Sequence, residues 1–113
     1  MSRRASGLKA WVVQRATAIY LALFGVYLTF HFALDAPADH AALVSWTTTP
    51  WVAVSLLLFI PAMLAHAWVG IRDVFMDYIK PIGLRVTALT LMAFVLLASG
   101  LWAMQAIIVA RIA

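Results

Sequence analysis

The segment from Val86 to Ala110 reads VTALTLMAFVLLASGLWAMQAIIVA and contains no charged residue. A membrane-spanning helix needs about 20 consecutive apolar residues, so this segment is long enough to cross a bilayer. The rest of the chain agrees, because its 113 residues are 66% hydrophobic and only 11% charged, with a mean hydropathy of +1.03. A soluble domain carries about a quarter charged residues. The sequence therefore predicts an integral membrane protein.

Two further apolar segments precede this one, and each is long enough to span the membrane. We expect an all-α fold with three transmembrane helices, at roughly residues 11–34, 51–71 and 82–110. Residues 35–50 form a polar loop, non-helical in part, because they contain prolines, aspartates and a run of threonines. Residues 1–113 are predicted to form a single membrane-anchor domain.

The distribution of basic residues predicts the orientation of the chain in the membrane. Those near span ends are Arg3, Arg4, Lys9 and Arg15 on the N-terminal side, Arg72, Lys80 and Arg85 between the second and third spans, and Arg111 at the C-terminus. The loop between the first and second spans has none. Cytoplasmic segments carry an excess of Lys and Arg, so we expect a cytoplasmic N-terminus and a periplasmic C-terminus.

Charge and cysteine content exclude several classes of function. The net charge is +4, but the basic residues lie at the ends of apolar segments, where they set topology, so no nucleic-acid partner is expected. The chain has no cysteine, which excludes a disulfide, thiolate catalysis and a cysteine-ligated iron–sulfur cluster in this chain.

His66 is the first candidate functional residue, because it lies inside an apolar helix. A charge at mid-helix in lipid costs about 2.5 kcal/mol or more, and neutral imidazole is a common metal ligand. Helical spacing places Gly70, Asp73 and Asp77 on the same stripe as His66. Gly70 leaves no side chain where a flat macrocycle would lie, so the stripe fits a haem ligated by His66. The alternative is a hydrogen bond from His66 to a neighbouring helix.

The other histidines do not match His66 in depth. At 1.5 Å per residue, His66 is about 9 Å from the cytoplasmic end of its span and His31 about 24 Å from the same surface. His40 lies in the outer loop. Two axial ligands of one iron need nearly equal depth, so a second histidine ligand must come from another chain. His31 and His40 are interpreted as interfacial residues.

Arg15, Asp77 and Tyr78 are the remaining candidates, all near the cytoplasmic boundary. The Arg15 guanidinium could hold a haem propionate through two hydrogen bonds, or simply reach the interface as an anchor. The Tyr78 hydroxyl could donate to a quinone carbonyl, with Asp77 orienting it or relaying protons. Alternatively, Tyr78 is an ordinary interfacial aromatic residue.

Four short sequence segments carry a resemblance of this chain to a known family. They are RATAI at residues 15–19, HAWVG at 66–70, DYIKP at 77–81 and LR at 84–85. With these motifs, the chain resembles the hydrophobic membrane-anchor subunits of bacterial succinate dehydrogenase, or respiratory complex II. Chain length, number of spans and orientation agree with the resemblance, which covers essentially the whole chain.

The resemblance implies a multi-pass subunit of the bacterial inner membrane that is not an enzyme in isolation. It implies pairing with a second three-helix anchor subunit, and attachment of a flavoprotein subunit and an iron–sulfur subunit on the cytoplasmic face. Electrons from succinate, in a step of the tricarboxylic acid cycle, would pass through FAD and iron–sulfur clusters in those partners to ubiquinone. Haem b would lie between the two anchors, and membrane lipid would surround the subunit.

The resemblance also implies roles for individual residues. By motif position, His66 is expected to be one axial haem ligand and Arg15 a propionate contact. Gly70 is expected beside the haem. Tyr78 is the expected donor to the quinone carbonyl, with Asp77 as a supporting or proton-relay group. No catalytic residue of its own is expected in this chain.

Three other functions compete with this interpretation. An anchor subunit of a fumarate reductase would look similar, and a purely structural subunit would bind neither haem nor quinone. A small drug-efflux transporter has a similar length. That class resembles four spans with a buried carboxylate, whereas this chain has three spans and no Glu, so the transporter is disfavoured.

Overall fold

The computed structural model describes residues 3–112, with side chains from residue 7 onward. Its helices are α1 (Arg3–Leu34), α2 (His40–Thr48), α3 (Pro50–Tyr78) and α4 (Ile82–Ile112). The membrane-spanning candidates within α1, α3 and α4 have 28, 29 and 31 residues. At 1.5 Å per residue each reaches roughly 42–46 Å, which exceeds the bilayer hydrocarbon thickness of about 30 Å. The ends of all three helices therefore extend into the headgroup region.

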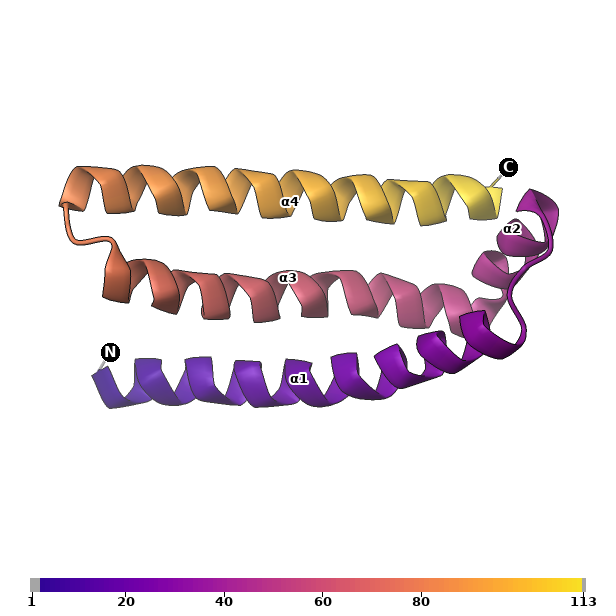
Figure 1. Cartoon of the computed structure of the whole chain (residues 1–113), viewed down its shortest axis with the longest axis horizontal. Coiled ribbons are helices and arrows are strands. Elements are labelled where there is room, and N and C mark those ends of the chain that lie inside the picture. The colour runs from indigo at the N-terminus through magenta and orange to yellow at the C-terminus, as the bar shows by residue number, and fades with distance from the viewer. Residues whose placement is uncertain (1–2, 113) are drawn as a thin grey trace.

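The middle helix, α3, runs antiparallel to α1 on one side and to α4 on the other (Figure 1). Helix α3 packs against both α1 and α4, whereas the backbones of α1 and α4 do not approach each other within residues 3–112. The beginning of α1 and the α3–α4 turn lie at one end of the molecule (Figure 1). Helix α2 and the end of α4 lie at the other. This arrangement matches the three predicted spans, and the site residues of α3 lie between the other two helices.

Very little of the chain is buried. The buried apolar side chains among the described residues are Phe24, Val52, Ala53, Val69 and Ile107. In the most apolar windows of the three spans, only 6% to 17% of residues are buried. In lipid the apolar surface needs no protein cover, because the surrounding lipid tails are themselves apolar. The helices are therefore held by a few contacts along two seams.

The α3–α4 seam is tightly packed at Gly100. A Cβ atom on Gly100 would overlap Cδ1 of Leu64, so only a glycine admits this approach without movement of Leu64. Small residues commonly allow such close packing between membrane helices. Gly100 therefore allows α3 and α4 to pack closely at this point.

The α1–α3 seam carries two polar links. The Tyr20 hydroxyl of α1 donates to the backbone carbonyl of Ser55, and the Thr17 hydroxyl is hydrogen-bonded to the His66 ring. Such bonds between membrane helices are worth about 0.6 kcal/mol on average. These links fix the rotation of α3 against α1 and so the direction in which His66 faces.

One feature of the fold differs from the sequence prediction. The predicted loop at residues 35–50 contains helix α2, whose start is capped where Asp39 accepts a hydrogen bond from the Ala42 amide at 2.8 Å. Helix α3 continues beyond the apolar span, from residue 71 to Tyr78, where the Ile79 amide still donates to the Phe75 carbonyl. No proline or glycine interrupts residues 71–78, so the helix ends only as Pro81 approaches.

Candidate functional site

His66 lies on the face of α3 that packs against α1. Its Nδ1 is hydrogen-bonded to Thr17 Oγ1 at 3.1 Å. The ring is half-buried, and no hydrogen bond among the described residues engages its Nε2. One ring nitrogen is therefore satisfied by a neighbouring helix, as the alternative interpretation of His66 expected, while the other has no partner in the described chain.

Gly70 lies one turn beyond His66 on the same face of α3, opposite Gln14 of α1. A Cβ on Gly70 would be in ordinary contact, at 3.5 Å, with Gln14 Nε2. Gln14 Oε1 is buried and has no hydrogen-bond partner. The space left by the missing side chain of Gly70 thus borders an amide group whose oxygen is unsatisfied.

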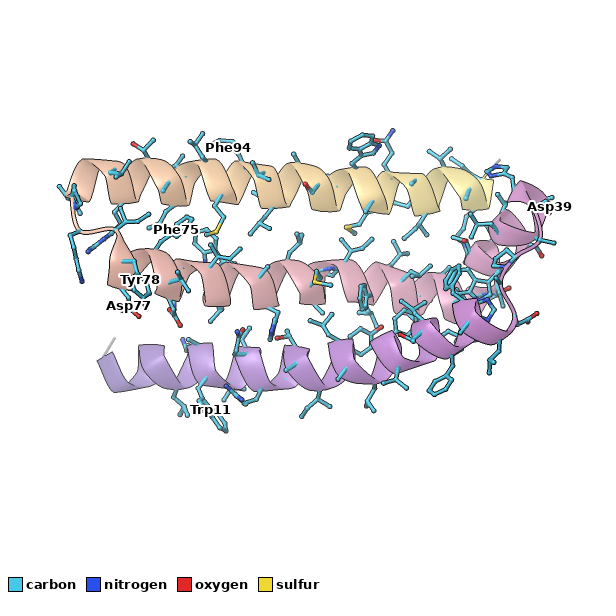
Figure 2. All side chains as sticks on the ribbon, in the orientation of Figure 1. Trp11, Asp39, Phe75, Asp77, Tyr78 and Phe94 are labelled. Atoms are coloured by element: carbon cyan, nitrogen blue, oxygen red, sulfur yellow. The ribbon has the colours of Figure 1, made fainter. Side chains whose placement is uncertain are left out.

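Arg15 does not join His66 and Gly70. Its guanidinium carbon lies 5.8 Å from the ring centre of Trp11, on the exposed surface of α1. Trp11 projects from the side of α1 opposite α3 (Figure 2). Residues two apart in a helix do not share a face, so Arg15 and Thr17 point in different directions. Arg15 is therefore available to a partner that approaches α1 from outside.

Asp77 and Tyr78 form the last residues of α3, beside the beginning of α1 (Figure 2). Both are exposed, and Tyr78 has 80% of its surface accessible. Tyr78 lies 12 residues beyond His66, or roughly 18 Å along the helix at 1.5 Å per residue. Arg72 and Asp73 form an exposed ion pair of 3.1 Å one to two turns before them. The Asp77–Tyr78 pair is thus a polar group at the membrane boundary, well separated from His66.

Arg85 closes the end of α3. Its Nε donates to the carbonyl oxygen of Ile79 at 2.8 Å and its Nη2 to that of Met76 at 3.3 Å. The last carbonyls of a helix lack partners within the helix, and a cation there also interacts favourably with the helix dipole. Arg85 therefore holds the backbone on both sides of Asp77 and Tyr78.

His31 lies at the other end of α1, stacked on Trp46 of α2 with ring centres 4.7 Å apart. Thr17, which contacts His66, precedes His31 by roughly 21 Å of helix. His40 begins α2 at the same end as His31. The depth difference predicted between His31 and His66 is therefore present in the structure. Across residues 3–112, no group of three His, Cys, Asp or Glu side chains is placed to hold a metal ion.

His66 fits one half of a haem site. A metal-ligating histidine usually donates its other ring N–H to a nearby acceptor, which fixes the ring. His66 has such a partner in Thr17, and its second nitrogen is unengaged. The remaining histidines of this chain lie near α2, so a second histidine ligand for a haem at His66 would have to come from another chain.

Sequence comparisons identify the family of the chain. Residues 1–103 match the family described as the succinate dehydrogenase/fumarate reductase transmembrane subunit. The chain belongs to this family. A relative from Coxiella burnetii, named succinate dehydrogenase hydrophobic membrane anchor subunit, is 32% identical over 97% of this chain and 94% of its own length. A Rickettsia felis protein of the same name is 33% identical over 76% of this chain and 72% of its own length.

Membership of the succinate dehydrogenase/fumarate reductase transmembrane family confirms the resemblance expected from the sequence. A third relative with the anchor-subunit name, from Rickettsia conorii, is 36% identical over 73% of this chain and 66% of its own length. These bacterial relatives and the three candidate spans make the chain a multi-pass protein of the bacterial inner membrane.

The sequence analysis assigned no role in the site to Thr17, Gln14 or Arg85, although two of them lie in the family motifs. Thr17 and Gln14 share one face of the first span. Polar side chains are rare inside a membrane span, and they usually pair with another polar group. That spacing is the signal that could have identified them. Arg85 gives no such signal, because its contacts depend on the path of the α3–α4 turn.

Proposed function

We propose that the chain is the membrane-anchoring subunit of a succinate:ubiquinone oxidoreductase. In this role it pairs with a second three-helix anchor subunit and holds the iron–sulfur and flavoprotein subunits at the membrane surface. Family membership and the names of the three relatives support the anchor role. Succinate oxidation belongs to the partners that carry FAD and iron–sulfur clusters. The chain alone is therefore not an enzyme.

The proposed orientation places the N-terminus and the α3–α4 turn in the cytoplasm. Residues 3–15 and residues 72–85, which include this turn, lie at one end of the molecule (Figure 1), and they carry seven of the eight basic residues. The loop containing α2 has no Lys or Arg. Positive charge favours the cytoplasmic side, so the C-terminus is proposed to be periplasmic. Reporter fusions at the two termini would test this topology.

The observation that carries the haem proposal is the bonding of His66. Thr17 engages Nδ1, and Nε2 remains for an axial bond. Haem b shared with the second anchor would supply a one-electron centre between the two subunits. Gly70 would border it. Arg15 would contact a propionate only after its side chain leaves Trp11 and turns toward the haem. A haem-free structural subunit is the alternative, and a reduced-minus-oxidised absorbance spectrum of the complex distinguishes the two.

The quinone proposal concerns the end of α3. Tyr78 is exposed at the membrane boundary, and its hydroxyl makes no hydrogen bond within the described chain, so it can donate to a quinone carbonyl. The adjacent carboxylate of Asp77 would orient that hydroxyl or pass a proton toward the bound quinone as it is reduced. The rest of the pocket would come from the second anchor and the iron–sulfur subunit.

A fumarate reductase anchor is the second candidate, because the family description includes that enzyme. The three relatives carry the succinate dehydrogenase name, which favours the first candidate. Comparing the rates of succinate oxidation and fumarate reduction by the purified complex would separate them.

The first test of the proposed function is purification of the tagged chain from its native membrane in a mild detergent. We expect a flavoprotein, an iron–sulfur protein and a second small membrane protein to be recovered with it. Recovery of the chain alone, in a form stable to the detergent, would contradict the anchor role.

A further inference from the structure

The bond between Thr17 and His66 defines where the hydrogen atoms lie. Thr17 Oγ1 is 2.6 Å from the carbonyl oxygen of Val13 and 3.1 Å from His66 Nδ1. A hydroxyl group has a single hydrogen, and a carbonyl oxygen can only accept. The shorter contact therefore takes the Thr17 hydrogen. The Gln14 carbonyl, at 3.3 Å, is also only an acceptor and leads to the same result.

With its hydrogen directed to the backbone, Thr17 Oγ1 can only accept from His66. Nδ1 must then carry the ring hydrogen, and Nε2 of the neutral ring has a free lone pair. The opposite tautomer would give up the shorter hydroxyl contact. It would also leave an N–H at Nε2 without an acceptor among the described residues, which is unfavourable in an apolar span.

We propose that Thr17 is a positioning residue that holds His66 as the Nδ1–H tautomer and so presents Nε2 for the axial bond. This inference rests on the haem role proposed above for His66. Thr17 acts from α1 and His66 from α3, so the bond sets the tautomer and the ring direction together. A partner of this kind also makes the ligand more basic, and its loss typically lowers metal affinity by about 10- to 100-fold.

The test uses the intact purified complex and three variants of Thr17. Thr17→Val keeps the shape and removes the hydroxyl, Thr17→Ser keeps the hydroxyl, and Thr17→Ala serves if the valine variant does not assemble. Thr29→Val is the matched control, because Thr29 makes the same kind of bond to the carbonyl four residues earlier, at 2.8 Å, but is exposed. Haem per complex, the ferric electron-resonance signal and the haem midpoint potential are measured.

We expect Thr17→Val or Thr17→Ala to reduce haem retention, shift the ferric signal and move the midpoint potential to a more positive value, because a less basic ligand stabilises ferric iron less. Thr17→Ser and Thr29→Val should match the unaltered complex. An unchanged signal and potential in the variants without the hydroxyl would overturn the inference, as would equal defects in Thr17→Ser. His66→Leu separates the two proposals. If it leaves the haem spectrum unchanged, the haem role itself fails, and the positioning role fails with it.

Discussion

Arg85, in the first turn of α4, donates from Nε to the carbonyl oxygen of Ile79 over 2.8 Å and so ties the beginning of α4 to the end of α3. The residue just before Ile79 is Tyr78, the proposed quinone donor. Arg85 thereby restrains the backbone that carries the proposed quinone donor.

Arg85→Gln should therefore raise the apparent KM for quinone. A hydrogen bond to a charged group contributes roughly 1.5–3 kcal/mol, and partial exposure of Arg85 reduces this to about 1 kcal/mol. That loss corresponds to about a fivefold change in KM. Steady-state quinone reduction by the complex is the measurement. Arg72→Gln is the control, since the exposed Arg72–Asp73 pair should contribute little. Equal effects of the two substitutions would contradict the restraint assigned to Arg85.

Tyr78→Phe should lower quinone reduction while succinate oxidation with an artificial dye acceptor persists. The side chain is 80% exposed, so loss of its hydroxyl should not disturb the fold. Tyr27→Phe is the matched control, because the Tyr27 hydroxyl accepts from Trp46 near α2, far from the proposed quinone contact. Loss of both activities in Tyr78→Phe would indicate failed assembly instead of a damaged quinone site.

His66→Leu should remove or alter the haem absorbance while leaving a substantial part of the complex assembled. The substitution costs the bond to Thr17, but Thr17 keeps its bond to the Val13 carbonyl, so α1 retains no unsatisfied hydroxyl. Recovery of the partner subunits and the absorbance spectrum are measured on the same preparation. His40→Leu, at the start of α2, should leave the spectrum unchanged.

Gly100→Val should destabilise the contact between α3 and α4 by about 1–3 kcal/mol, the usual cost of overpacking. The added side chain would overlap Leu64, whereas Gly25 has nothing within 4 Å of an added Cβ. Gly25→Val is therefore a control expected to be close to neutral. Thermal unfolding of the purified complex measures the difference. Rescue of Gly100→Val by Leu64→Ala would assign the cost to this contact.

The three spans could be predicted because their signal is local. Each is a long apolar segment with polar or basic ends, and no distant contact is needed to recognise it. Helix α2 was not predicted, because a short helix depends on its Asp39 cap and on its neighbours more than on periodicity. The end of α3 extends beyond the predicted span because helix formation continues where apolar composition stops.

The candidate site was only partly predictable for a related reason. His66 and Tyr78 are recognisable from residue type and position within one helix. The partners that act on them come from other helices: Thr17 on α1 contacts His66, and Arg85 on α4 reaches the backbone near Tyr78. The sequence also gave no sign that Gln14 lies against Gly70. The haem and quinone roles stay predictions until the complex is measured.

The scarcity of buried side chains has a consequence for how this chain selects its neighbours. In a bilayer, apolar surface is already surrounded by lipid, so hydrophobicity alone does not favour one protein partner over another. Selection of one partner among the many helices of a membrane must therefore come from the shape of the helix surface and from isolated polar atoms. The exposed Arg15, the unengaged ring nitrogen of His66 and the uneven shape of the helix surface are features of that kind. Together they favour a partner subunit whose shape and polar groups match them.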